Sequence, residues 1–234
     1  IRDRNVTGVQ TCALPISGDI KSSFPSMKNQ VAAGLNMGIA GIPWWTTDIG
    51  GFFGANINDP EFHELLVRWF EYGCFCPVMR LHGYRWPLQP QYGTTGGATC
   101  VSGAPNEVWS YTDQVCEILS DYLRLRERML PYITELMEEA HEKGTPVMRP
   151  LFYDFPEDKE SWNVETEYMF GPKVLVKPIT DADARETDVY LPGGASWTNA
   201  WTGETFEGGQ KVHVAAPIEQ IPLFTRDGYK LPMK

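Results

Sequence analysis

Apolar residues recur at helical spacing in three stretches of the chain. Their spacing predicts helices at residues 22–34 and 61–75, the second preceded by an Asn-Asp-Pro turn. A longer helix is expected over residues 106–143, where proline and glycine mark two special points. Pro131 is expected to break or kink it, because proline lacks the backbone N–H, and Gly144 is a plausible stop.

Between these helices lie two short apolar runs that predict buried strands. The first, residues 39–45, is followed by Thr-Thr-Asp and then by two glycines. The second, residues 77–83, again ends in polar residues and a glycine. The stretch 84–105 is rich in Gly, Pro and Thr without a period, which predicts a long loop of the kind that is often functional or mobile.

The pattern changes after Pro146, where short β-type runs alternate with turn signals such as Pro-Gly-Gly and Gly-Gly. This alternation predicts an antiparallel sheet or sandwich of roughly 70–80 residues. The expected strands are 168–170, 174–176, 187–191, 211–214 and 221–224.

The order of elements therefore predicts an α/β chain: the C-terminal part of a (β/α)8 TIM barrel followed by an all-β sandwich domain. Two strands with polar residues at their carboxyl ends fit such a barrel, whose sites gather on that face. The βα units are too few to close a barrel, so the chain is expected to be a fragment. We place the barrel portion at residues 17–162 and the proximal C-terminal β-sandwich domain at 163–234.

Composition and charge exclude some classes of binding partner. The 234 residues carry a formal charge of −10, and 42% of them are hydrophobic, which is enough for a large core. An acidic chain lacks the basic footprint that nucleic acid or an anionic membrane requires. The five cysteines and four histidines show no disulfide framework and no metal-ligand spacing, so no metal site and no cofactor are expected.

Residues 1–16 do not fit the rest of the chain. Val6–Ile16 resembles the in-frame translation of a sequencing-library adapter over eleven consecutive residues. A natural edge strand with a turn at Pro15 is the alternative. We exclude this stretch from the fold prediction as a suspected artefact.

Three polar side chains stand where strand ends are expected: Asp19, Asp48 and His82. Each has an ordinary interpretation, as a helix-cap or turn aspartate or as a core histidine. Together with the tryptophans Trp44 and Trp45, they offer what a sugar pocket needs. Carboxylates and imidazole bind hydroxyl groups directionally, and indoles pack on the apolar face of the ring.

The segment Trp44-Trp-Thr-Thr-Asp-Ile-Gly-Gly-Phe52, followed by Arg80-Leu-His-Gly83, strongly resembles glycoside hydrolase family 31. That family comprises α-glucosidases and α-xylosidases, with some lyases and transglycosylases. The resemblance extends from residue 17 to 234 and includes Met148-Arg-Pro-Leu-Phe152. It implies retaining hydrolysis by two carboxylates without a cofactor.

The resemblance also implies roles for single residues. The family's acid/base aspartate ends a Trp-x-Gly-Asp pattern 29 residues before the Asp-Ile-Gly-Gly aspartate, and 48 − 19 = 29 assigns this role to Asp19. Ile16 occupies the tryptophan position. Asp48 and His82 match residues that bind hydroxyls of the sugar at the cleaved bond.

The remaining assignments concern the walls of that subsite. Phe52 matches an aromatic lining residue, Trp45 is expected to contact the sugar, and Arg80 is expected to support the subsite, with a structural ion pair as its alternative. No position of this chain matches the family's nucleophile, so the chain alone is expected to be inactive.

The variant Arg-Leu-His-Gly resembles bacterial α-xylosidases that trim xyloglucan oligosaccharides, with α-glucosidase as the close alternative. The expected partner is an oligosaccharide, neither nucleic acid nor a membrane, and no oligomeric state is assigned. An exported bacterial protein is expected rather than a cytoplasmic one. A different class stays open: a non-catalytic carbohydrate-binding or structural piece.

Overall fold

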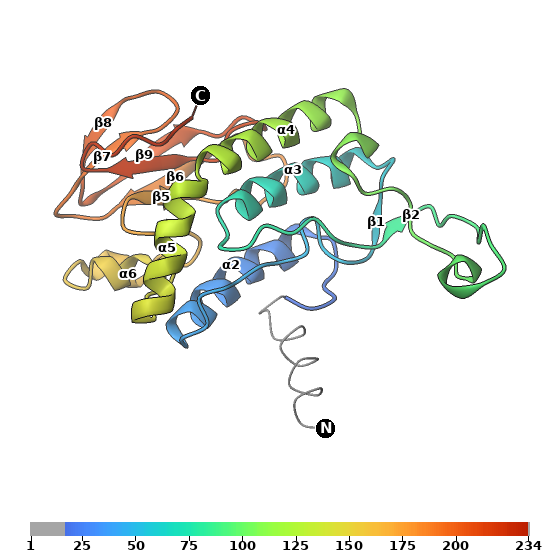
Figure 1. The fold of residues 1–234 in the computed structure, drawn as a ribbon. Helices are drawn as coiled ribbons and strands as arrows, with labels where there is room; N and C mark the ends of the chain where they lie inside the picture. Colours follow the sequence, from blue (N-terminus) through green and yellow to red (C-terminus); the bar gives the residue numbers. More distant parts are fainter. Residues whose placement is uncertain (1–16, 234) are drawn as a thin grey trace, which may run out of the picture.

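The computed structural model describes residues 17–233 (Figure 1). The adapter-like stretch and the tryptophan position at Ile16 lie outside these residues. The N-terminal half contains α2 (Phe24–Ile39), β1 (Ala55–Asn56), α3 (Pro60–Cys74) and β2 (Arg85–Trp86). The 3-10 turns η1 (Gly96–Thr99) and η2 (Val108–Ser110) lie in the long segment before α4 (Asp113–Arg128) and α5 (Leu130–Lys143).

Local signals explain where α2 and α3 begin. Ser23 caps α2 by accepting a hydrogen bond from the backbone N–H of Ser26, and Asp59 caps α3 in the same manner. The helix predicted over 61–75 is confirmed. The expected end of α2 at Gly34 is wrong, because this glycine makes room for a neighbour: a Cβ there would lie 2.6 Å from the Trp45 indole.

The strands expected at 39–45 and 77–83 are not formed. Instead, two extended segments share the hydrogen bonds Val78 N–H to Trp45 O and Ile49 N–H to Arg80 O, both 3.2 Å long. Two such bonds do not make a ladder. The first segment packs on α2 and α3 through Trp45 and Ile49, whereas the second is only partly buried. Among the described residues, a parallel ladder forms just beyond them, between β1 and β2.

The single helix expected over 106–143 is two helices in the structure. Thr112 caps α4 by accepting from the N–H of Val115, so the helix begins seven residues later than predicted. Met129 separates α4 from α5, two residues before Pro131, which occupies the first turn of α5 where its missing N–H costs little. Gly144 ends α5 as expected, in a left-handed conformation with φ of 71°.

The C-terminal strands form a six-stranded antiparallel sheet and a separate pair, β6 with β9. The predicted strands are confirmed, whereas β3, β7 and β8 were not predicted. A core of Trp197, Phe224, Leu175, Leu191 and Val189 packs between the two sheets, as expected of a sandwich. The bounds in sheet order are β3 (Met148–Pro150), β4 (Tyr168–Phe170), β5 (Val174–Val176), β10 (Leu223–Arg226), β7 (Ser196–Asn199) and β8 (Thr205–Glu207), then β6 (Glu186–Leu191) and β9 (Gln210–Ala215).

The sheets lie at one end of the helices, and the loop after β2 projects from the other end (Figure 1). β3 belongs to the six-stranded sheet although it precedes residue 163, and the domain boundary expected there stays a prediction. Within the described residues, no helix is both long and apolar enough to cross a membrane.

A buried polar network joins α3 to the C-terminal region. Arg68 donates to Glu71 (3.1 Å) and to the carbonyl of Ala216 (2.6 Å). The Tyr122 hydroxyl donates to Glu71 (3.0 Å) and accepts from the N–H of Ile221 (3.0 Å). Burial raises the pKa of Glu71 to about 8, although Arg68 opposes the shift.

This network predicts how stability depends on pH. Because the pKa of Glu71 is higher in the folded state than in the unfolded one, its contribution is complete below about pH 4.5 and is lost as the pH rises towards 8. In the original chain, the free energy of unfolding should fall across this window by up to about 1.4 kcal/mol per pH unit because of Glu71. Denaturant unfolding at several pH values is expected to show that Glu71→Gln lacks this fall. Glu138→Gln, at an exposed position, serves as the control. The same pH dependence in the unchanged chain, in Glu71→Gln and in Glu138→Gln would contradict the prediction.

Candidate active site

Asp48 is a buried carboxylate at the start of a glycine-rich loop, residues 48–54. Its side chain is only 3% exposed, and its Oδ1 lies 3.5 Å from the Arg80 Nε. Oδ1 has no hydrogen-bond donor among the described residues. Burial raises the pKa of Asp48, whereas the charges of Arg80 and His82 lower it. The site therefore contains an acceptor that is only partly satisfied, which suits a ligand hydroxyl.

The loop around Asp48 packs on the segment that carries Asp19. The N–H of Phe52 donates to the carbonyl of Ile20 (2.8 Å), and the N–H of Ser22 donates to the carbonyl of Phe53 (2.8 Å). Gly51, with φ of 77°, allows this contact, because a Cβ there would lie 2.7 Å from the Ser22 backbone. Asp19 itself is exposed, and its charge is close enough to raise the pKa of Asp48.

Phe52 and His82 come together beside this carboxylate. Their ring centroids lie 5.6 Å apart with the planes tilted by 41°. His82 is exposed and Phe52 is half-buried, so both rings remain accessible. The structure thus gathers five expected residues from three loops: Asp19, Asp48, Phe52, Arg80 and His82.

Trp45 does not join this group. Its side chain is buried and its indole packs against Gly34 of α2. Thr47 and Ile49 lie on the same side of the extended segment, since Thr47 accepts from Trp69 and Ile49 packs on Gly73.

The alternation of an extended chain then places Trp44 on the face that carries Asp48. Trp44 is 41% exposed, whereas Trp45 is 5% exposed. Counting back from Asp48 in steps of two is the signal that would have selected Trp44 from the sequence.

Arg85, which the sequence analysis did not single out, holds the loops in place. Its guanidinium is fully buried and donates to the carbonyls of Gly51 (2.8 Å) and Ile49 (3.1 Å), and to the Asn106 side chain (3.1 Å). A Cβ at Gly83 would lie 2.5 Å from this guanidinium, so the position requires glycine. Burial lowers the pKa of Arg85. Arg85 is thus a positioning residue beneath Asp48.

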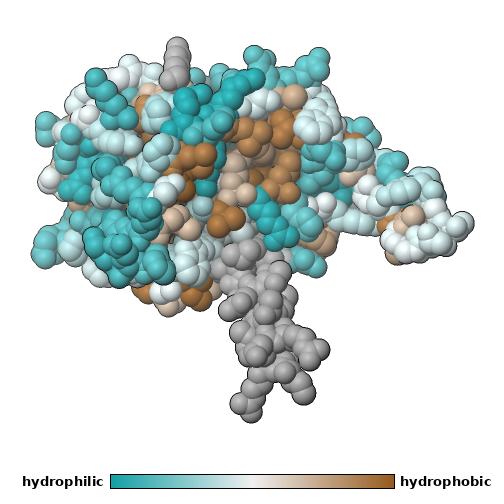
Figure 2. All heavy atoms as spheres, in the orientation of Figure 1, coloured by the Kyte–Doolittle hydropathy of each residue, from teal (hydrophilic) through white to brown (hydrophobic). Residues whose placement is uncertain are grey.

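The arrangement can bind a polyhydroxylated ring, with acceptors on one side and aromatic rings on another. No three potential metal ligands of the described part of the chain lie close enough together to hold a metal ion. Figure 2 shows apolar residues gathered near the centre of one face and surrounded by hydrophilic ones. The large apolar side chains of Trp44 and Phe53, in the segments next to Asp48 and Phe52, are also exposed.

Comparisons with known proteins give a consistent result. The family model "Glycosyl hydrolases family 31 TIM-barrel domain" matches residues 4–136, and "Glycosyl hydrolase family 31 C-terminal domain" matches residues 144–231. An alpha-xylosidase of Saccharolobus solfataricus is 38% identical over 94% of this chain, and alpha-glucosidase 2 of Bacillus thermoamyloliquefaciens is 34% identical over 95%.

Solved structures agree with these relatives. The structure of an alpha-xylosidase from a soil metagenome, complexed with xylose, has a TM-score of 0.89 and 51% sequence identity over 93% of this chain. The chain spans only 32% of that protein, and 28% and 25% of the two curated relatives.

Proposed function

Because this chain belongs to glycoside hydrolase family 31, we propose that it is the part of a retaining α-glycoside hydrolase that carries the acid/base and half of the sugar subsite. The fit to an alpha-xylosidase complexed with xylose, at 51% identity and a TM-score of 0.89, carries the proposal. The most favoured substrate is a terminal α-linked xylose on a xyloglucan-type oligosaccharide. An α-glucosidase of the same family is the second candidate, since such relatives also match.

The proposed chemistry uses the residues gathered above. Asp19 gives its proton to the leaving oxygen and later acts as base towards water, which suits its exposed position. Asp48 accepts hydrogen bonds from the sugar hydroxyls, and His82 donates to them. Phe52 packs against the sugar ring. Arg80 orients Asp48 through the 3.5 Å ion pair. The nucleophile, about 5–5.5 Å from the acid/base in retaining enzymes, comes from the remainder of the intact protein.

A chimaera tests this proposal. Residues 17–234 replace the matching third of the soil-metagenome alpha-xylosidase, and hydrolysis of p-nitrophenyl α-xyloside and α-glucoside is compared. We expect turnover with a preference for xyloside of more than about tenfold, because the glucoside adds a hydroxymethyl group at C5. A preference for glucoside would favour the second candidate, and no turnover would favour a non-catalytic carbohydrate-binding piece.

Asp19→Ala in the same chimaera tests the acid/base role. Cleavage of an oligosaccharide, whose leaving group is poor, is expected to slow by roughly 10²–10⁴-fold. Cleavage of activated aryl xylosides is expected to slow less, because their leaving groups need little proton donation. Rates with a series of leaving groups measure this. A uniform loss across the series would contradict the assignment.

A further inference from the structure

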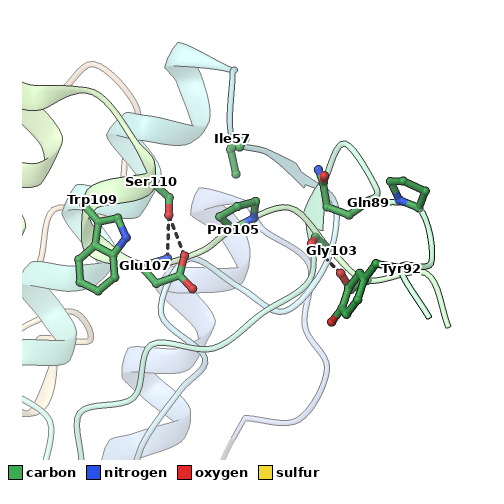
Figure 3. A pocket seen from close by; sticks show the side chains of 10 residues that line it. Ile57, Gln89, Tyr92, Gly103, Pro105, Glu107, Trp109 and Ser110 are labelled. Carbon is green, nitrogen blue, oxygen red and sulfur yellow. Dashed lines mark hydrogen bonds between the residues drawn. The ribbon is translucent and has the colours of Figure 1, made fainter. Parts of the chain in front are cut away.

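A cleft lies along the long loop after β2, and none of the residues gathered around Asp48 lines it. It has a volume of about 800 Å³ and runs between Tyr92 and Trp109 (Figure 3). The floor between them contains Ile57 and Pro105. Tyr92 is 81% exposed and Trp109 is 75% exposed, so both rings offer their faces to a ligand.

Hydrogen bonds on both walls hold this cleft open. The Ser110 hydroxyl donates to the Glu107 carboxylate (2.8 Å), and the Glu107 N–H donates back to that hydroxyl (3.1 Å), which closes the turn that presents Trp109. On the other wall, Gln89 and Ser102 exchange two backbone hydrogen bonds of 2.9 and 3.3 Å. An exposed indole on a closed turn is a preorganised platform.

The chemistry of the lining selects a class of ligand. The hydrogen bond from Ser110 lowers the pKa of Glu107, which keeps this carboxylate ionised as an acceptor, and Gln89 adds an amide. Residues 87–110 contain no Lys or Arg, and the whole chain carries a charge of −10, so a polyanion is disfavoured. Aromatic faces beside acceptors suit a neutral sugar chain.

Arg85 connects one wall of the cleft to the candidate active site. Asn106, next to Glu107, accepts a hydrogen bond from the Arg85 Nε (3.1 Å). The same guanidinium donates to Gly51 and Ile49 in the loop of Asp48. One buried arginine therefore fixes both the sugar-binding loop and one wall of the cleft.

We propose that this cleft binds the β-linked glucan chain that carries the terminal α-linked sugar, with Trp109 and Tyr92 as stacking platforms. The inference rests on the proposed function, since it assigns the leaving-group part of that substrate. It makes the loop after β2 a determinant of substrate length.

Binding to the 234-residue chain itself tests the inference. Cellotetraose is the probe, because it has no terminal α-linked sugar for the first subsite, and calorimetry with tryptophan fluorescence measures its affinity. Trp109→Ala and Tyr92→Ala are each expected to weaken binding by about tenfold. Trp162→Ala is the matched control: this tryptophan is 58% exposed but stacks on Phe152 in the C-terminal region.

Some results would overturn the inference about the cleft, and different ones would overturn the proposed function. Equal affinity in all variants, no binding of cellotetraose, or binding of maltotetraose alone would overturn the inference. Self-association that Trp109→Ala abolishes would instead assign the cleft to a second copy of the chain, and would equally overturn it. The aryl xyloside assay of the chimaera uses no glucan chain, so failure here leaves the proposed function standing, and failure there leaves the cleft standing.

Discussion

Replacing Arg85 by methionine is expected to lower the free energy of unfolding by about 3–5 kcal/mol. The buried guanidinium donates to the carbonyls of Ile49 and Gly51 and to Asn106, and methionine offers none of these bonds. Carbonyl oxygens that lose their partners in a dry environment each cost about 1–3 kcal/mol. Denaturant unfolding of the 234-residue chain measures the loss.

Arg124→Met is the matched control for this prediction. Arg124 is 64% exposed and pairs with Asp121 on the surface of α4, so its loss is expected to cost less than about 1 kcal/mol. In the chimaera, Arg85→Met should also lower activity, because the loop of Asp48 loses its anchor. Equal stability losses in the two variants would show that Arg85 does not hold the loops.

Asp48→Asn is expected to separate function from stability. In the chimaera, kcat/KM for the α-xyloside should fall about a hundredfold, since a charged acceptor for a sugar hydroxyl is replaced by a neutral amide. In the chain itself the melting temperature should rise. Because burial raises the pKa of Asp48, the ionised carboxylate costs the fold free energy that the neutral carboxylic acid does not.

Asp181→Asn, at an exposed position, controls for a general effect of removing one negative charge. It should leave both activity and melting temperature nearly unchanged. A fall in melting temperature with Asp48→Asn, together with full activity, would mean that Asp48 is a structural partner of Arg80. The two outcomes therefore decide between a ligand group and an ion-pair group.

Most residues of the candidate site could be named from the sequence because they lie in two short motifs, Trp44–Phe52 and Arg80–Gly83. Asp48 and His82 stood out because each follows an expected strand, and the family resemblance added Phe52 and the binding roles. The structure brings the three residues together through the contacts of one glycine-rich loop. Arg85 was not found, since an arginine two residues beyond a motif looks like any surface arginine until its burial is known.

Trp45 shows the converse case: it was expected to contact the sugar, and the structure buries it away from the site. The sequence offers two adjacent tryptophans, and the packing of Trp45 against Gly34 shows that this one faces the helix, in agreement with the alternation counted back from Asp48. The cleft between Tyr92 and Trp109 was likewise invisible, because its walls are seventeen residues apart in a stretch without a period (109 − 92 = 17).

The sequence by itself determined the starts of α2, α3 and α5, the stop at Gly144 and the principal strands of the sandwich. Caps, prolines and alternating apolar residues act within a few residues of one another, so these features need no distant partner. Only the tertiary structure decided the length of α2, the absence of regular strands at 39–45 and 77–83, and the burial of Arg85. Those outcomes depend on which surfaces bury which side chains, and burial is set by contacts between segments far apart in the chain.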